Sequence, residues 1–328
     1  MGTDGSTVSD WLTKAQLDGT GPSPRPYAVV LGEALVDLYE IEVAGERLFR
    51  PMVGGAPLNV ACGLARLGAD SRFVGSLGAG AFGDRIRAVL TEQGVDYSGC
   101  VTVDVPTTLA VTSLRGAEPE FAFYGNPPSY GLLDRVDLDV VAGAGTLYCG
   151  SIALLQPTTL ATAKTAWATP GPLRTLDPNV RPDLLDDPSA LQATVEWFAS
   201  TADLVKLSEP DARLLFGLDP VAAAKHLLSL GARAVVVTLG AEGALGFADG
   251  AEFSATPPPV NAIDATGAGD ATMAALNFAL LTGGFPATEE QWRSVLAFAV
   301  RAGSFACETR GGATAMPPLS RLRGAPYA

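Results

Sequence analysis

Asp270 ends the segment Asn261-Ala-Ile-Asp-Ala-Thr-Gly-Ala-Gly-Asp270, and small residues with helical spacing follow at 271–281. Gly267 and Gly269 leave backbone N–H groups uncovered where this helix is predicted to start. Such a helix end favours an anion, above all a phosphate in transfer, because its dipole is positive and its first N–H groups lack partners. The Asp270 carboxylate is then placed to take a proton from an attacking hydroxyl. The structural alternative is a simple helix cap, since aspartate is among the best capping residues.

A second glycine-rich turn, Gly54-Gly55-Ala-Pro-Leu-Asn59, also enters a helix of small residues. Its glycines allow a ligand to approach the backbone closely, and Asn59 offers the donors and acceptors that sugar hydroxyls need. Upstream, Asp37 follows the first predicted strand and could accept two bonds from a polyol. Taken alone, these residues could equally be a glycine turn with an asparagine cap and a solvated loop acid.

The usual signatures of nucleotide binding are absent or weak. No lysine follows a glycine, which excludes the GxxxxGK[ST] phosphate loop. Gly78-Ala-Gly80-Ala-Phe-Gly83 matches the dinucleotide fingerprint by letter, but its strand is not the first of the sheet, and a lone GxGxxG among 37 glycines is weak. A nicotinamide oxidoreductase built on this turn is the main rival hypothesis. The alternative interpretation of the same residues is a tight strand-to-helix turn that binds no ligand.

The elements that must position these residues alternate between strands and helices. Short apolar runs predict strands at 27–31, 72–77, 146–150, 173–176, 204–207 and 234–239. Helical spacing predicts helices at 58–67, 85–93, 158–168, 190–200, 210–216, 221–230, 269–281 and 290–307. Such alternation implies an α/β fold with a parallel sheet covered on both faces and ligands at the carboxyl ends of the strands.

Two segments, Leu38–Val53 and Val101–Tyr124, break this alternation because they read as strands and turns without an intervening helix. They could form a small sheet that covers a site. We therefore expect one domain over 27–318 with lid strands at about 38–53 and 101–124. A mobile N-terminal tail is expected at 1–26 and a C-terminal tail at 319–328.

Composition argues against several classes of partner. A formal charge of −13 would repel a phosphate backbone, so no nucleic acid is expected. No apolar run approaches the roughly 18 residues of a membrane-spanning helix, so no membrane is expected either. The 4 cysteines are scattered in a chain that is large enough to be stable without disulfide bonds. This favours reduced thiols and a cytoplasmic location.

Taken together, the motifs resemble the ribokinase and fructokinase family of sugar kinases, also called the phosphofructokinase-B type, over about residues 27–317. The early signature region is Gly54–Asn59, and the later one is Asp264–Asp270. Further matches follow in the family's order: Asp177-Pro-Asn-Val-Arg181, Lys206-Leu-Ser-Glu-Pro-Asp211, Thr238-Leu-Gly-Ala-Glu-Gly243 and Arg310-Gly-Gly-Ala313. The resemblance implies a ribokinase-like three-layer fold with a mostly parallel central sheet and a small β-lid.

The resemblance also implies transfer of the ATP γ-phosphoryl group to a primary hydroxyl of a small sugar. Mg²⁺ would accompany ATP, and K⁺ is a further candidate. Asp270 would be the catalytic base, with the amides of Gly267, Ala268 and Gly269 as an anion hole. The implied sugar-binding residues are Asp37, Gly54, Gly55, Asn59, Phe123 and Arg181. The implied ATP-binding residues are Lys206, Ser208, Thr238, Gly240 and Gly243, together with Gly267 and Gly269. Asp211 would act on the metal through water, and Asp264 would belong to a monovalent-cation site.

The chain departs from the family pattern at four positions. Ser208 and Asp211 stand where the family has Asn-x-x-Glu, so the shorter acid reaches less far toward a metal. Ala265 replaces a common hydroxyl or proline, and Gly80 replaces a frequent aspartate. The changes at 265 and 80 remove no catalytic group. Relatives often dimerise through the lid, so a homodimer is a candidate state.

The choice of sugar depends on the lid. A sugar carboxylate closed away from water needs a cation or several donors, and the segment Phe121–Tyr130 has no basic residue where relatives carry an arginine. This absence favours fructose, a neutral ketohexose, over 2-keto-3-deoxygluconate, although Arg181 could still serve a carboxylate. Ribose, another pentose and a nucleoside stay open as substrates. A non-catalytic sugar-binding module is the alternative from a different class.

Overall fold

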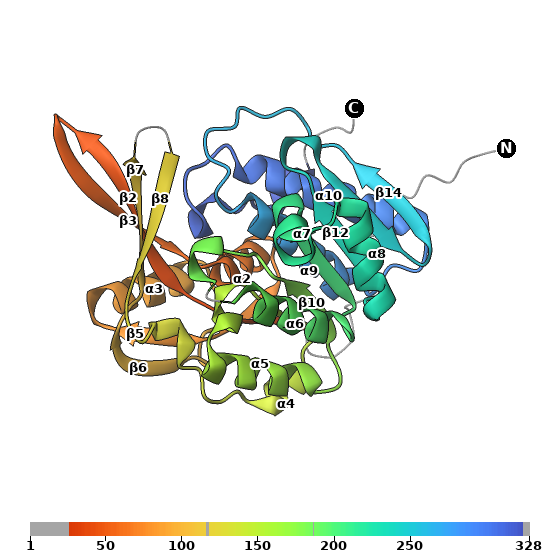
Figure 1. Ribbon diagram of the computed structural model, residues 1–328, viewed down its shortest axis with the longest axis horizontal. Helices are drawn as coiled ribbons and strands as arrows, with labels where there is room; N and C mark the ends of the chain where they lie inside the picture. The colour runs from red at the N-terminus through yellow and green to blue at the C-terminus, as the bar shows by residue number, and fades with distance from the viewer. Residues whose placement is uncertain (1–25, 116–117, 186, 324–328) are drawn as a thin grey trace.

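A sheet of eight strands forms the centre of the computed structural model, which describes residues 26–115, 118–185 and 187–323 (Figure 1). The strands lie in the order β14-β13-β12-β11-β10-β9-β1-β4. They run parallel from β4 to β12, and β13 is antiparallel to both of its neighbours, β12 and β14. Their bounds are β1 (Tyr27–Leu31), β4 (Asp70–Val74), β9 (Thr146–Gly150), β10 (Leu173–Asp177), β11 (Leu204–Ser208), β12 (Ala234–Thr238), β13 (Ala244–Ala248) and β14 (Ala251–Ala255).

Helices cover both faces of this sheet because alternate side chains of each strand point to opposite faces. Ala28 and Val30 of β1 join a core with the first group of helices, whereas Val29 and Leu31 join a core with the second. The first group is α2 (Ala56–Arg66), α3 (Gly80–Glu92), α9 (Ala268–Gly283) and α10 (Glu289–Ala306). The second is α4 (Leu138–Ala142), α5 (Pro157–Ala168), α6 (Pro188–Ala199), α7 (Glu209–Phe216) and α8 (Pro220–Leu230). The predicted three-layer α/β architecture is confirmed.

A separate sheet of four strands within the described residues, in the order β3-β2-β7-β8, stands beside the core at the left of Figure 1. Its strands are β2 (Leu35–Val43), β3 (Glu46–Gly54), β7 (Leu109–Arg115) and β8 (Glu118–Tyr124). The predicted lid segment began at Val101, but β6 (Val101–Pro106) pairs instead with β5 (Ser76–Ala79). The Val101 N–H donates to the Gly75 carbonyl at 2.9 Å, which fastens this strand to the core.

Two further expectations need correction. The predicted strand at 72–77 is divided between β4 and β5. The predicted C-terminal tail begins instead with a helix, α11 (Leu319–Arg323), because Leu322 is buried and its carbonyl accepts a hydrogen bond from Arg301 Nη1 at 2.9 Å. The predicted N-terminal tail lies outside the described residues except for Pro26, as does 324–328.

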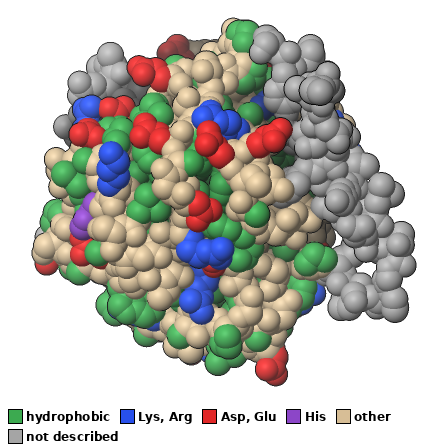
Figure 2. All heavy atoms as spheres, turned by 90° about the vertical axis from the view of Figure 1, so that its right-hand side faces the viewer, with side chains coloured by type: hydrophobic (Ala, Val, Ile, Leu, Met, Phe, Trp, Pro, Cys, Tyr) green, Lys and Arg blue, Asp and Glu red, His purple; other side chains and the backbone are tan. Residues whose placement is uncertain are grey.

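Within the described ranges, every helix falls short of the length or the hydropathy that a bilayer crossing requires. On the face drawn in Figure 2, acidic and basic side chains are interspersed with apolar and neutral ones. The visible part of this face therefore carries charges of both signs.

Candidate active site

Asp270 lies in the first turn of α9, with its carboxylate buried between two asparagine side chains. Asn59 Nδ2 donates to Oδ2 at 2.7 Å, and Asn179 Nδ2 donates to Oδ1 at 3.4 Å. The N-cap of α9 is Gly267, and no described side chain caps this helix, so the alternative reading of Asp270 as a cap is wrong. Burial raises the pKa of Asp270, although the hydrogen bond from Asn59 and nearby cations oppose the rise. This carboxylate is therefore a stronger proton acceptor than an exposed aspartate.

The start of α9 presents backbone N–H groups beside Asp270. Gly267 has a left-handed φ of 80°, and a Cβ there would lie 3.0 Å from the Met316 side chain. Within the described part of the chain, the N–H groups of Gly267 and Gly269 have no backbone partner. The N–H of Ala268 is used in a turn, since it donates to the Ala265 carbonyl at 3.2 Å. The predicted anion hole is thus reduced to the amides of Gly267 and Gly269.

Asp37 projects from β2 close to Gly54, and a Cβ on that glycine would lie 2.1 Å from Asp37 Oδ2. Glycine at position 54 is what leaves room for the carboxylate. Burial raises the pKa of Asp37 to about 7, with Arg181 lowering it and Asp270 raising it further. Their electrostatic coupling indicates that the predicted sugar-binding carboxylate and the predicted base share one site.

Gly55 and Asn59 fix the entry to α2. Gly55 has a φ of 107°, and a Cβ there would lie 2.6 Å from the Glu33 carbonyl oxygen. Asn59 is buried against Gly312, where a Cβ would lie 2.4 Å from Asn59 Nδ2. Nδ2 uses one of its two N–H groups on Asp270, and the buried Oδ1 has no partner among the described residues.

A buried ion pair joins Lys206 Nζ to Asp177 Oδ2 at 2.7 Å. Burial raises the pKa of Asp177 to about 6, with Lys206 opposing the rise. Burial would lower the pKa of Lys206, but Asp177 and further carboxylates outweigh it and raise the pKa. The ammonium lies 3.4 Å from where a Cβ on Gly269 would stand, so Lys206 is a fixed positive charge beside the start of α9. We expected a direct ATP contact from this residue, whereas its side chain is 4% exposed.

The loop after β10 carries Asn179 and Arg181. Asn179 has a left-handed φ of 40°, uncommon for a residue with a side chain, and its N–H donates to Asp177 Oδ1 at 3.2 Å. Arg181 Nη1 donates to Asn179 Oδ1 at 2.6 Å. The guanidinium lowers the pKa of both Asp37 and Asp270, so Arg181 lies near these two carboxylates. Its contact with the sugar stays a prediction.

The residues predicted to bind ATP gather at the carboxyl ends of two neighbouring strands. Ser208 of β11 pairs in register with Thr238 of β12, and the turn after β12 holds Gly240 and Gly243 with φ of 60° and 98°. Ser208 and Asp211 form a capping box at the start of α7, in which Ser208 Oγ donates to Asp211 Oδ2 at 2.6 Å. Contact of Ser208 with ATP and of Asp211 with a water-held metal stays a prediction.

Asp264 accepts two backbone hydrogen bonds, from the Thr266 N–H at 2.9 Å and the Gly311 N–H at 3.0 Å. Burial alone would raise the pKa of Asp264, but these bonds and the Arg310 charge lower it, so the carboxylate stays ionised. In the described residues no three His, Cys, Asp or Glu side chains cluster as a metal cage. A Mg²⁺ ion here would need the ATP phosphates as ligands, which is how proteins commonly hold it.

Two parts of the structure meet near Phe123, which packs on a small core between β2, β7 and the turn after β9. Tyr39 of β2 lies near the loop before α9, since Asp264 of that loop contributes, after burial and Asp37, to the raised pKa of Tyr39. These contacts place the small sheet against the loop of the predicted base.

Sequence reasoning assigned no role to Glu33, Asp177 or Asn179. Asp177 and Asn179 belong to the motif Asp177-Pro-Asn-Val-Arg181, in which the resemblance implies a function for Arg181 alone. Glu33 is an acid at the end of a buried strand, which is the signal that could have identified it.

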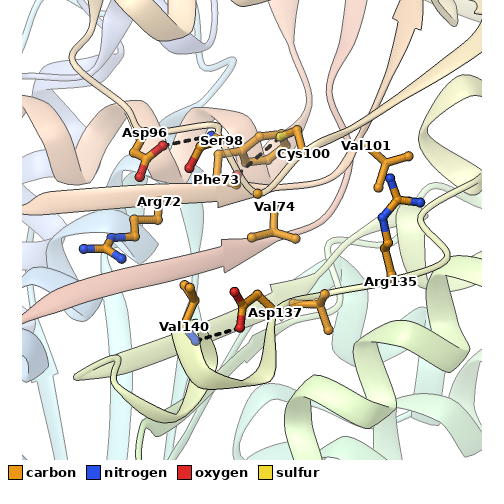
Figure 3. Close-up of a pocket in the computed structure, with 12 residues that line it drawn as sticks. Arg72, Phe73, Val74, Asp96, Ser98, Cys100, Val101, Arg135, Asp137 and Val140 are labelled. Atoms are coloured by element: carbon orange, nitrogen blue, oxygen red, sulfur yellow. Dashed lines mark hydrogen bonds between the residues drawn. The ribbon is translucent and has the colours of Figure 1, made fainter.

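The GxGxxG turn is closed by its own packing. A Cβ on Gly78 would lie 2.6 Å from the Thr107 backbone nitrogen, and one on Gly83 would lie 2.0 Å from the Gly78 carbonyl oxygen. These glycines therefore serve a tight strand-to-helix turn. A cavity of about 430 Å³ lies elsewhere, at the edge of the sheet beside β4, where Arg72 and Arg135 lie on opposite sides of it (Figure 3).

Known proteins resemble this chain over most of its length. Residues 25–319 match the model of the pfkB family carbohydrate kinases. A fructokinase of Escherichia coli is 36% identical over 304 residues, covering 89% of this chain and 97% of the relative. The crystal structure of a fructokinase with bound ATP from Xylella fastidiosa is 28% identical with a TM-score of 0.83, covering 90% of this chain and 97% of that one. A fructokinase of Vibrio cholerae with fructose, ADP and calcium bound is 28% identical with a TM-score of 0.79, covering 91% and 98%.

The match covers both the sequence and the fold over most of the chain. It also removes the nicotinamide oxidoreductase hypothesis, for which the packed GxGxxG turn offers no open cradle. The chain belongs to the pfkB family of carbohydrate kinases, with a ribokinase-like fold, and is a phosphotransferase that acts on a sugar hydroxyl.

Proposed function

We propose that this chain is a fructokinase that transfers the γ-phosphoryl group of ATP to a primary hydroxyl of fructose. The observation that carries the proposal is the placement of Asp270. Its carboxylate, in the first turn of α9, is held by two amides and lies next to the N–H groups of Gly267 and Gly269, which have no backbone partner in the described residues. A proton acceptor and an anion site therefore stand side by side.

In the proposed reaction, Asp270 takes the proton of the sugar hydroxyl. The oxygen of that hydroxyl bonds to the γ-phosphorus of ATP, and the bond between the γ-phosphorus and the bridging β-phosphate oxygen breaks. ADP leaves. The amides of Gly267 and Gly269 and the Lys206 ammonium stabilise the negative charge of the passing phosphoryl group. Bound Mg²⁺ would neutralise charge on the ATP phosphates. Closure of the small sheet over the sugar would exclude water, which otherwise competes as acceptor.

Asp37 and Arg181, with the backbone at Gly54 and Gly55, are proposed to hold the sugar hydroxyls. Residues 122–130 of the described lid contain no basic side chain, which favours a neutral sugar over 2-keto-3-deoxygluconate. The relatives named fructokinase favour fructose over ribose or a nucleoside. The alternative acid sugar would have to be held by Arg181, whose guanidinium lowers the pKa of Asp37 and Asp270.

Four accompanying proposals rest on fewer observations. Asp264, ionised beside the loop before α9, would serve a K⁺ site, and Asp211 would contact Mg²⁺ through water. Exposed apolar side chains on the small sheet support a homodimer formed through it: Val43, Leu48, Phe49 and Tyr124. The free cysteines support a cytoplasmic location.

A substrate panel tests the choice of sugar. Fructose, 2-keto-3-deoxygluconate and ribose are supplied at matched concentrations with ATP and Mg²⁺, and kcat/KM is measured for each. Fructose should give the highest value, because the proposed sugar side offers a carboxylate to neutral hydroxyls. A markedly higher kcat/KM for either of the other two sugars would overturn the assignment.

A further inference from the structure

Glu33 is a buried carboxylate at the carboxyl end of β1, and the proposed mechanism gives it no role. Glu33 is 1% exposed. Burial raises the pKa of Glu33 to about 7, and backbone N–H groups, together with the Arg181 charge, oppose the rise. An ionisable group is costly to bury unless its hydrogen bonds are satisfied, so the partners of Glu33 indicate its use.

One carboxylate oxygen holds the start of α2. Glu33 Oε1 accepts the N–H of Ala56, the first residue of that helix, at 3.1 Å. Asn59 lies three residues further and so on the same face of the helix. It donates to Asp270 Oδ2 at 2.7 Å. A displacement of the start of α2 would therefore move the amide that holds Asp270.

The other oxygen holds the turn after β9. Glu33 Oε2 accepts the N–H of Ala153 at 3.2 Å. In the same turn, the Ser151 N–H donates to the Asp177 carbonyl at 3.0 Å. Asp177 begins the loop in which Asn179 donates to Asp270 Oδ1 at 3.4 Å. This second series of contacts therefore ends at Asp270 Oδ1, whereas the first ends at Asp270 Oδ2.

We propose that Glu33 is a positioning residue for phosphoryl transfer: its carboxylate connects the two segments that bring Asn59 and Asn179 against opposite oxygens of Asp270. Glu33 touches neither substrate. It acts by keeping the acceptor oxygen of Asp270 in line with the sugar hydroxyl. The inference rests on the proposed role of Asp270 as base.

The test is a double-mutant cycle on the full chain with Glu33→Gln and Asn59→Ser, read as kcat and KM for fructose and for ATP. Glutamine keeps the size of the side chain but offers one acceptor oxygen for two N–H groups. We expect kcat to fall about 10- to 100-fold in Glu33→Gln, the scale of a misplaced reacting group, with both KM values changed little. In the Asn59→Ser background, Glu33→Gln should lower kcat by a clearly smaller factor, because the contact of Asn59 with Asp270 is already lost. Asp137→Asn is a control for loss of a carboxylate outside the site, because Asp137 accepts two backbone N–H groups on one oxygen at the start of α4, beside the cavity of Figure 3. It should leave kcat unchanged.

Equal factors in the two backgrounds, or an unchanged kcat in Glu33→Gln, would overturn the inference. A rise in KM for fructose at constant kcat would do so too, because it would assign Glu33 to sugar binding. If Glu33→Gln does not fold, the same cycle is run with Glu33→Asp, whose shorter side chain reaches the Ala56 and Ala153 N–H groups less well, and the same non-additivity is required. A wild-type chain without kinase turnover would refute the proposed function itself, which separates the two failures.

Discussion

Replacing Asp270 by asparagine removes the proton acceptor and keeps the size of the side chain. The wild-type carboxylate accepts Asn59 on one oxygen and Asn179 on the other, whereas an asparagine offers a single oxygen. The hydroxyl of the sugar would have to lose its proton without a base. We expect kcat to fall by about 100-fold or more, the usual contribution of general base catalysis.

Two opposing terms keep the effect on stability small. One of the two asparagine donors loses its acceptor, which costs about 1–3 kcal/mol for a buried group. Against this, the raised pKa of Asp270 shows that burial disfavours the charged carboxylate, and the neutral amide removes that cost. The free energy of unfolding should therefore change by no more than about 2 kcal/mol.

The assay measures ADP release at saturating ATP and sugar, together with thermal unfolding of the same samples. Asp219→Asn is the control, because Asp219 caps α8 by accepting the Ala222 N–H at 2.9 Å, outside the site. That variant should keep its kcat. If folded Asp270→Asn turned over at a near-normal rate, Asp270 would not be the base.

Other perturbations test neighbouring parts of the site. Gly267→Val should lower activity far more than it lowers stability, because valine is strained at a φ of 80° and its Cβ would approach Met316. A folded variant with normal activity would refute the anion hole. The raised pKa values of Glu33 and Asp37, about 7 each, mean that the folded state binds more protons than the unfolded state between about pH 4 and 7, so thermal stability without ligands should fall as pH rises through this window. Asp37→Asn should flatten that dependence, and an unchanged slope would contradict the burial of this carboxylate. In Asn59→Ser the acid limb of the kcat profile should move to higher pH, because the hydrogen bond that lowers the pKa of Asp270 is lost; an unmoved limb would exclude this contact in solution.

Strands and helices were predictable where the apolar pattern was continuous. The strands at 27–31 and 146–150 have the predicted bounds because their side chains are buried on both faces of the sheet. The pairing of β6 with β5 was not predictable, since an alternating strand reads the same in either sheet. Helix α11 is too short to show periodicity, and Leu322 acquires its burial only from the rest of the fold.

In the candidate site, the sequence indicated which residues could carry chemistry but not which partners they would have. Asp270 was found because glycines precede it at a helix start. The same motif did not show that the Ala268 N–H closes a turn on Ala265, or that Lys206 is buried against Asp177. Those contacts join segments distant in the chain, and only the packed fold brings them together.

Direct measurement of phosphoryl transfer tests the central claim. Wild-type chain is incubated with ATP, Mg²⁺ and fructose, and both ADP and phosphorylated sugar are quantified. The account predicts equal amounts of ADP and fructose phosphate, formed only when sugar is present. Fructose binding without ADP would indicate a non-catalytic binding module, and ADP formed at the same rate without sugar would contradict the proposed transfer.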